Sequence, residues 1–150
     1  MRVLIQRVRS ASVSVYGERI GSIGNGALLF VGFTHRDCEK AVTELASKTV
    51  NLRIFPDEQG RLQHSLIDVG GEILAVPQFT LYASTNRGRR PDFTHALAPD
   101  QASDLFDKFV FALDRVANRP IATGKFGTDM KVNLENDGPF TVMLAREPTD

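Results

Sequence analysis

The sequence predicts an α/β domain in which two helices cover strand-rich layers. Short apolar runs recur from residue 3 to residue 144, either alternating with polar residues or bounded by glycine, as in strands. Two longer segments, 37–50 and 99–116, instead repeat apolar residues at helical spacing. The chain has 150 residues and shows no linker, repeat or low-complexity stretch, so we expect a single domain over residues 1–150.

The first third of the chain predicts strands followed by one helix. Val3–Ile5 and Val13–Val15 alternate with polar residues, and Tyr16–Arg19 is predicted as a hairpin turn. Gly26–Phe33 is a continuous apolar run, which is typical of a strand buried on both faces. A helix is expected to open at Asp37 and to bury one face, made of Val42, Leu45, Ala46, Thr49 and Val50.

The remaining elements are predicted in the order strand, strand, helix, strand, strand. Leu52–Phe55 is expected to be a short strand ended by the turn-forming segment 56–60, and a buried strand over Ile73–Val76 leads into Pro77. Pro99 is expected at the start of the second helix, where its missing N–H is harmless. Two strands, 130–134 and 140–144, are predicted to flank a turn. The apolar stripe of the second helix comprises Leu105, Phe106, Phe109, Val110, Leu113 and Val116.

Composition limits the classes of partner. Lysine plus arginine and aspartate plus glutamate each number 18, so the formal net charge is zero. Because proteins that bind nucleic acid by general attraction are usually basic, any nucleic-acid partner must be held by a local patch. Cys38 is the only cysteine, which excludes a disulfide within the chain and fits a reducing cytosol. The strand-like N-terminus shows neither a signal peptide nor a membrane span, so we expect a cytoplasmic protein.

The first candidate site is the segment Pro77-Gln78-Phe79-Thr80-Leu81. It is either a strand crossing the core or a break in the sheet, because proline cannot donate to the strand ladder. A break would leave the N–H groups of Phe79 and Thr80 facing a ligand, and such pairs stabilise the oxyanion of an acyl-transfer intermediate. Gln78 would add a side-chain donor. Thr80 is at most a weak nucleophile, since no histidine or carboxylate follows it at a recognisable spacing.

The second candidate site is the segment 136–141, Asn-Asp-Gly-Pro-Phe-Thr. Asp137-Gly138 between two alternating strands is a strong hairpin signal, so a plain turn is the simplest interpretation. Pro139 fits that interpretation poorly, because it removes a ladder donor where the return strand would begin. A cis bond between Gly138 and Pro139 would instead hold two successive carbonyl oxygens in fixed directions, suited to binding an ammonium group.

These two segments resemble the signature motifs of the D-aminoacyl-tRNA deacylases, usually written SQFTL and NxGPxT. The resemblance covers essentially the whole chain, because four further stretches look like family segments in the right order. They are Gln6-Arg7-Val8, Arg53-Ile54-Phe55, Arg87-Gly88 with Arg90-Pro91 and Phe93, and Gly124-Lys125-Phe126-Gly127 with Asp129-Met130.

The resemblance implies a β/β/α fold and a homodimer that hydrolyses the ester between a D-amino acid and the 3′ end of tRNA, as chiral proofreading in translation. A cis Gly138-Pro139 would reach into the partner's active site, bind the α-amino group and exclude an L side chain. Gln78, Phe79 and Thr80 would surround the ester. Glycine has no side chain to exclude, so glycyl-tRNA, including glycine mischarged on tRNA-Ala, is a further candidate substrate.

Pro77 departs from the family motif, which usually begins with serine. Proline has no hydroxyl, so any role of the serine hydroxyl does not apply to this chain. We group Pro77 with Gly138 and Pro139 as residues of substrate selection. A proline at this place also resembles a related deacylase group that has a trans Gly-Pro bond and acts on L-alanyl-tRNA, although that group usually has alanine where this chain has Phe79. A dimeric RNA- or protein-binding module that has lost catalysis is a further alternative.

Other sequence features are less specific. HExxH, CxxC and Walker motifs are missing, so we expect neither a metal nor a nucleotide cofactor. Arg87, Arg89 and Arg90 follow the first motif and are candidates for contacts to tRNA phosphates. A solvated loop is an equally good interpretation of this basic run.

Overall fold

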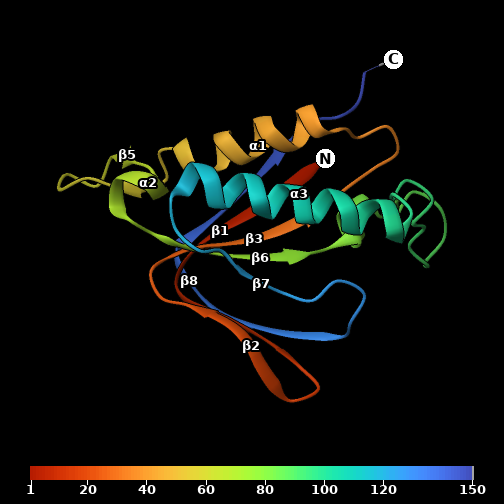
Figure 1. Ribbon diagram of the computed structural model, residues 1–150, viewed down its shortest axis with the longest axis horizontal. Coiled ribbons are helices and arrows are strands. Elements are labelled where there is room, and N and C mark those ends of the chain that lie inside the picture. Colours follow the sequence, from red (N-terminus) through yellow and green to blue (C-terminus); the bar gives the residue numbers. More distant parts are fainter. Residues whose placement is uncertain (150) are drawn as a thin grey trace.

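Two long helices lie side by side on one face of a six-stranded sheet in the computed structural model, which describes residues 1–149 (Figure 1). The sheet contains β1 (Arg2–Val15), β2 (Glu18–Ile23), β3 (Gly26–Gly32), β6 (Glu72–Pro77), β7 (Ala122–Thr123) and β8 (Met130–Ala145). The helices are α1 (Glu39–Asn51), α3 (Pro99–Ala117), the short α2 (Leu66–Val69) and the 3-10 helix η1 (Phe79–Tyr82). Strands β4 (Phe55–Pro56) and β5 (Leu62–His64) form a separate pair. The predicted α/β class is confirmed.

Strands β1 and β8 pass through both layers of strands beneath the helices. Residues 2–8 of β1 pair with β3, and residues 11–15 pair with β2. Strand β8 follows β1 antiparallel along its whole length, whereas β6 pairs parallel with β3 and β7 parallel with β6. The sheet therefore folds over, so that β2, in the lower layer of Figure 1, contacts β6 and β7 in the layer directly beneath the helices.

Strand β3 is buried on both faces, as its continuous apolar run predicts. Leu29 and Val31 belong to the core beneath the helices, whereas Leu28 belongs to a second core between the two strand layers. Strand β6 divides in the same way, with Ile73 in the first core and Leu74 in the second. This alternation explains why both strands read as unbroken apolar runs rather than as half-buried strands.

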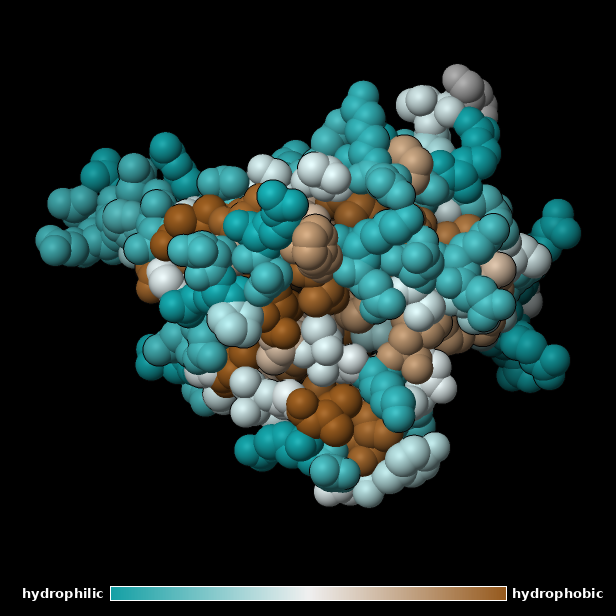
Figure 2. All heavy atoms as spheres, in the orientation of Figure 1, coloured by the Kyte–Doolittle hydropathy of each residue, from teal (hydrophilic) through white to brown (hydrophobic). Residues whose placement is uncertain are grey.

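Helix α1 buries the predicted face, because Val42, Leu45, Ala46, Thr49 and Val50 are all buried. It begins at Glu39 rather than at Asp37, because the Asp37 carboxylate accepts a hydrogen bond from the N–H of Thr34 and closes a turn before the helix. Figure 2 shows that the outer side of the helices is largely hydrophilic, with hydrophobic residues gathered between them.

Helix α3 begins at Pro99, as predicted, and ends where Asn118 adopts a left-handed conformation. Its predicted stripe is buried at Leu105, Phe106, Phe109 and Leu113, and Val110 packs partly buried against the same core. Val116 is an exception, because it is exposed at the groove between α3 and α1.

The hairpin predicted at Tyr16–Arg19 is confirmed. Val15 pairs with Glu18, so Tyr16 and Gly17 form a two-residue loop. Both residues have positive φ angles, 51° and 77°, as a type I′ turn requires.

The turn predicted between residues 134 and 140 is wrong. Leu134 pairs with Ala11 and Thr141 pairs with Gln6, so the chain continues in one direction along β1. The register shifts twice between Gln6 and Ser10, which makes the segment Asp137-Gly138-Pro139 a bulge within β8 rather than a chain reversal. An Asp-Gly pair accommodates either structure, and only the partner strand distinguishes them.

The strand predicted at Leu52–Phe55 is also wrong in its position. Only Phe55 and Pro56 have strand geometry, and the N–H of Ile54 donates to the carbonyl of Leu52 in a tight turn directly after α1. Helix α2 was not predicted, although Ser65 and Asp68 form a reciprocal capping box at its start.

Candidate active site

The first candidate segment lies where β6 leaves the sheet. Pro77 is the last residue of β6 and pairs with Val31, whose carbonyl accepts the N–H of Gln78. The chain then turns at once into η1, so the predicted break is confirmed. The N–H groups of Phe79 and Thr80 are in the first turn of η1, where helix geometry provides them with no acceptor. The side-chain amide of Gln78 donates to the hydroxyl of Thr80.

A cavity of about 630 Å³ opens beside this segment. Pro77, Gln78 and Phe79 line it together with Phe126 and Met130. Phe79 is 54% exposed and packs edge-on against Phe93, with ring centroids 5.1 Å apart. The cavity is mainly apolar, with polar backbone at one edge, which is the usual make-up of a small-molecule site.

A buried ion pair supports the wall formed by residues 93–98. The α-ammonium of Met1 donates to Oδ1 of Asp37 at 2.8 Å, and the side chains of these residues are 0% and 2% exposed. The other oxygen of Asp37 accepts the N–H of Thr34, and the Thr34 hydroxyl donates to the carbonyl of His95. This series of contacts links the N-terminus to the rim of the cavity.

The carboxyl end of η1 is held by a second cluster. Arg2 donates to the carbonyl of Leu81 at 2.8 Å and to Glu147 at 2.7 Å, and its guanidinium lies over the Tyr82 ring. Burial, reinforced by the charges of Asp37 and Glu147, raises the pKa of the Tyr82 hydroxyl above its usual range. Burial opposes ionisation of Glu147, but the hydrogen bond from Arg2 holds the pKa of this carboxyl below its usual range.

The second candidate segment is a bulge fixed by two side chains. The Asn136 amide accepts the N–H of Phe140 at 2.7 Å and donates to its carbonyl at 3.1 Å, which replaces the missing ladder bonds. Arg7, which is buried, donates to the carbonyl of Asp137 at 2.9 Å and lies over the Phe140 ring. The Gly138–Pro139 bond is cis, as the resemblance implies, and both residues are exposed.

One chain does not bring the two segments together. Val8 pairs with Asn136 and with Gly26, and Gly26 in turn pairs with Glu72, the first residue of β6. Pro77 is the last residue of the same strand. Five residues separate these ends, so they are about 17 Å apart at the usual strand rise of about 3.3 Å per residue.

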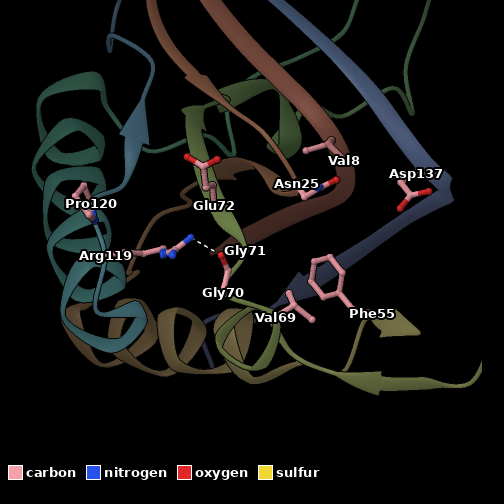
Figure 3. Close-up of a pocket in the computed structure, with 10 residues that line it drawn as sticks. All are labelled: Val8, Asn25, Phe55, Val69, Gly70, Gly71, Glu72, Arg119, Pro120 and Asp137. Carbon is pink, nitrogen blue, oxygen red and sulfur yellow. Dashed lines mark hydrogen bonds between the residues drawn. The ribbon is translucent and has the colours of Figure 1, made fainter. Parts of the chain in front are cut away.

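The bulge has a cavity of its own, with a volume of about 780 Å³. Figure 3 shows Asp137 at the bend of β8, across this cavity from Arg119, which donates to the carbonyl of Gly70. Glu72 lines this cavity, whereas Pro77 lines the other one. The two cavities therefore lie at opposite ends of β6.

The basic run lies in an exposed loop directly after η1. The backbone groups of Ser84 and Asp92 bond to each other and close the loop at its base. Arg87, Arg89 and Arg90 lie between these residues and are exposed. Within residues 1–149, no group of three or more His, Cys, Asp and Glu side chains is placed to hold a metal ion. In the same part of the chain, no helix is long and apolar enough to cross a membrane.

Residues 4–145 match the family model described as D-Tyr-tRNA(Tyr) deacylase. The chain belongs to this family. It is 54% identical over 144 residues to the D-aminoacyl-tRNA deacylase of Chloroflexus aurantiacus, with 96% of this chain and 89% of that protein covered. It is 49% identical to the D-aminoacyl-tRNA deacylase of Chlorobaculum parvum, with 96% and 97% covered.

The fold of this deacylase family also recurs among solved structures. The chain superimposes on the structure of the c-Myc DNA unwinding element binding protein with a TM-score of 0.93 and 38% identity. The superposition covers 99% of this chain and all of that one.

Sequence reasoning missed three residues that organise the candidate site. Arg7 and Asn136 hold the bulge, and Asp37 anchors the cavity wall. Asn136 is part of the second motif and Arg7 is part of a family segment, so both had a sequence signal. Asp37 had none, because its partner is the α-ammonium of Met1 and is distant in the chain.

Proposed function

We propose that the chain hydrolyses the ester bond of D-aminoacyl-tRNA and releases the D-amino acid and free tRNA. The observation that carries the proposal is the family match over residues 4–145, together with the exposed residues Phe79 and Thr80, whose N–H groups start η1 beside an apolar cavity. We expect the enzyme to act in the cytoplasm, on the 3′ end of tRNA and without a cofactor.

The N–H groups of Phe79 and Thr80 are proposed to stabilise the oxyanion that forms when the ester carbonyl is attacked. Gln78 orients the Thr80 hydroxyl and borders the cavity, so both side chains help to position the ester. An aminoacyl ester is intrinsically reactive, so positioning and charge stabilisation suffice without a strong nucleophile. A water molecule breaks the ester, either by direct attack or after the neighbouring ribose 2′-hydroxyl has first taken over the acyl group as a 2′ ester.

A homodimer with an active site shared between subunits is the arrangement that fits the separation of the two segments. Gly138 and Pro139 are exposed and lie near the Glu72 end of β6, which is about 17 Å along that strand from Pro77 in the same chain. In a twofold dimer, the bulge of each chain reaches the Gln78 segment of the other, and both sites form at once.

Gly138, Pro139 and Pro77 are proposed to select the D enantiomer. The exposed backbone of the bulge would accept the substrate's ammonium group and leave no room for an L side chain. Because this selection uses backbone rather than contacts to the substrate's own side chain, many D-amino acids are expected as substrates. Glycine, which has no side chain, is expected to be accepted as well.

The proposal is tested by measuring deacylation of matched D-Tyr-tRNA and L-Tyr-tRNA. Rapid release of D-tyrosine with L-Tyr-tRNA left intact supports it, and the absence of release from both substrates contradicts it. Preferential cleavage of L-Ala-tRNA would instead favour the related L-alanine deacylases.

Shared sites are tested by mixing Gln78→Ala and Gly138→Ala chains, each of which is expected to keep only a small residual activity alone. Random exchange of subunits makes half of the dimers mixed, and each mixed dimer has one intact site, so about one quarter of wild-type activity should return. A mixture that keeps only this residual activity after exchange would show that both residues act within one chain.

Contacts to tRNA are proposed for Arg87, Arg89 and Arg90. A neutral chain offers few phosphate contacts, so the salt dependence of tRNA binding should be shallow. Replacing all three arginines by glutamate should weaken tRNA binding without lowering stability, as measured by filter binding and by urea unfolding. Unchanged affinity would place the phosphate contacts elsewhere.

A further inference from the structure

Tyr16 is an aromatic residue whose position the fold does not explain. It occupies the first position of the two-residue β1–β2 turn, with φ of 51°, and its side chain is 91% exposed. Type I′ turns favour asparagine or glycine at this position, and a bulky residue with positive φ is rare. The turn therefore does not require an aromatic ring, and the ring contributes almost nothing to either core.

The hairpin tip lies close to one of the residues that line the Gln78 cavity. Val15 pairs with Met130, and Met130 lines that cavity. Tyr16 is one residue, about 3.8 Å, beyond Val15, and a cross-strand pair of Cα atoms is about 5 Å apart. The Tyr16 Cα is thus within roughly 10 Å of the cavity lining. Figure 1 shows the hairpin of β2 projecting from the lower layer beside the start of β8.

The tip also carries basic side chains. They lie on the face of β1 opposite to that of Val15, whose partner Met130 lines the cavity, so RNA leaving the cavity would pass around the tip to reach them. Ser14 pairs with Arg19 in β2 and with Lys131 in β8, and paired residues project to the same side of a sheet. Lys131 is exposed and also pairs with Asp129, at 2.8 Å. An exposed ring on a rigid two-residue turn, with two cations on the adjoining strands, matches the way proteins bind single-stranded nucleic acid, with bases stacked on aromatic rings and phosphates held by basic groups.

We propose that Tyr16 stacks on an unpaired base of the single-stranded RNA 3′ end, next to the terminal nucleotide that carries the ester. Arg19 and Lys131 contact the phosphates on either side of that base. The proposal rests on the proposed function, because it assigns part of the substrate to the hairpin. Stacking tolerates any base, so this contact serves every tRNA with a free 3′ end.

The test compares two substrates that differ only in the RNA. One is D-Tyr-tRNA, and the other is the D-tyrosyl ester of adenosine, which lacks the base that Tyr16 would contact. Tyr16→Ala should raise KM for D-Tyr-tRNA about tenfold with kcat unchanged, which is the size expected for loss of one stacked base. The same variant should hydrolyse the adenosine ester as well as the wild type does. Tyr16→Phe keeps the ring and should behave as the wild type on both substrates.

Phe111→Ala is the matched control. Phe111 is also an exposed aromatic residue, 62% exposed, but it lies on α3 in the helical layer. It should leave KM unchanged for both substrates. An equal rise in KM on both substrates for Tyr16→Ala, or no rise on either, would overturn the proposal.

A binding measurement keeps the inference separate from catalysis. Filter binding of uncharged tRNA to the wild type and to Tyr16→Ala does not depend on hydrolysis. Weaker binding by Tyr16→Ala and normal binding by Tyr16→Phe would support the stacking contact even if the wild type fails to release D-tyrosine. Equal binding by all three proteins would contradict it whatever the catalytic result.

Discussion

The two ends of β6 fix their motifs by different means. At the end that carries Gln78, the buried carboxylate of Asp37 neutralises the buried α-ammonium of Met1. At the other end, the buried guanidinium of Arg7 is satisfied mainly by carbonyls, those of Asp137 and Ile54. The Asp137 carboxylate is 3.8 Å away, and its side chain is 40% exposed.

The difference shows which end is supported from inside the molecule and which end lies at its surface. The ion pair at the Gln78 end lies inside the molecule and supports the rim of a cavity through Thr34 and His95. The Arg7 contacts brace an exposed bulge from beneath and leave Gly138 and Pro139 at the surface. An open cavity at one end and a braced projection at the other are the complementary features that the proposed homodimer with shared sites requires.

The largest expected effect is on stability, and it differs between the two acidic residues Asp37 and Asp137. Asp37→Ala should lower the free energy of unfolding by about 3–5 kcal/mol, because it leaves the Met1 ammonium buried without a counter-charge. Asp137→Ala should lower it by less than about 1 kcal/mol, because its carboxylate is partly exposed and Arg7 keeps its carbonyl partners. Urea unfolding of both variants tests the comparison, and equal losses would show that the two ends are fixed alike.

The second effect is on activity at the bulge. Gly138 has φ of 146°, and a Cβ there would lie 2.9 Å from the N atom of Phe140 and 3.0 Å from an Arg7 nitrogen. Gly138→Ala should therefore displace the bulge and lower kcat/KM for D-Tyr-tRNA by about 100-fold, the size of effect that a shift of about 1 Å produces in a reacting complex.

Gly60→Ala is the matched control for that change. Gly60 also has a positive φ, 79°, but nothing lies within 4 Å of its added Cβ. Gly60→Ala should therefore cause only the backbone strain of a positive φ, and it should leave kcat/KM for D-Tyr-tRNA unchanged. If the two alanine variants lose activity equally, the bulge has no special role.

A smaller effect is expected at the Gln78 end. Thr80→Ala removes the hydroxyl that accepts the Gln78 amide but leaves the backbone N–H groups in place. The loss of one neutral hydrogen bond should lower kcat by no more than about tenfold. A loss of about a millionfold, as seen when catalytic serines are removed, would instead identify Thr80 as the nucleophile.

The smallest effect concerns acid stability of the cluster behind η1. The pKa of Glu147 is lower in the folded protein than its ordinary value of 4.5. The ionised carboxyl therefore adds to the free energy of unfolding above pH 4.5, and this stabilisation is lost as the pH falls below that value. Glu147→Gln should therefore lose less stability than the wild type between pH 6 and pH 3. Parallel urea midpoints across that range would contradict this.

Local patterns predicted the elements whose structure depends on neighbouring residues. The helical face of α1, Pro99 at the start of α3 and the Tyr16-Gly17 turn all follow from spacing or turn chemistry. The strand at Leu52–Phe55 failed because four residues after a helix carry too little periodicity to separate a strand from a tight turn. The exposure of Val116 depends on how far α1 extends beside α3. The apolar stripe in the sequence of α3 does not show this.

The sequence by itself determined the family, the alternation of strands and helices, and the residues of both motifs, because composition, periodicity and motif order are local properties. Only the tertiary structure decided that residues 136–141 form a bulge and not a hairpin, since the partner strand β1 sets the direction of β8. It also decided that the two motifs lie at opposite ends of β6 and that Arg7 and Asp37 support them. These are contacts between residues far apart in the chain, and no local pattern records which distant groups meet when the sheet folds over.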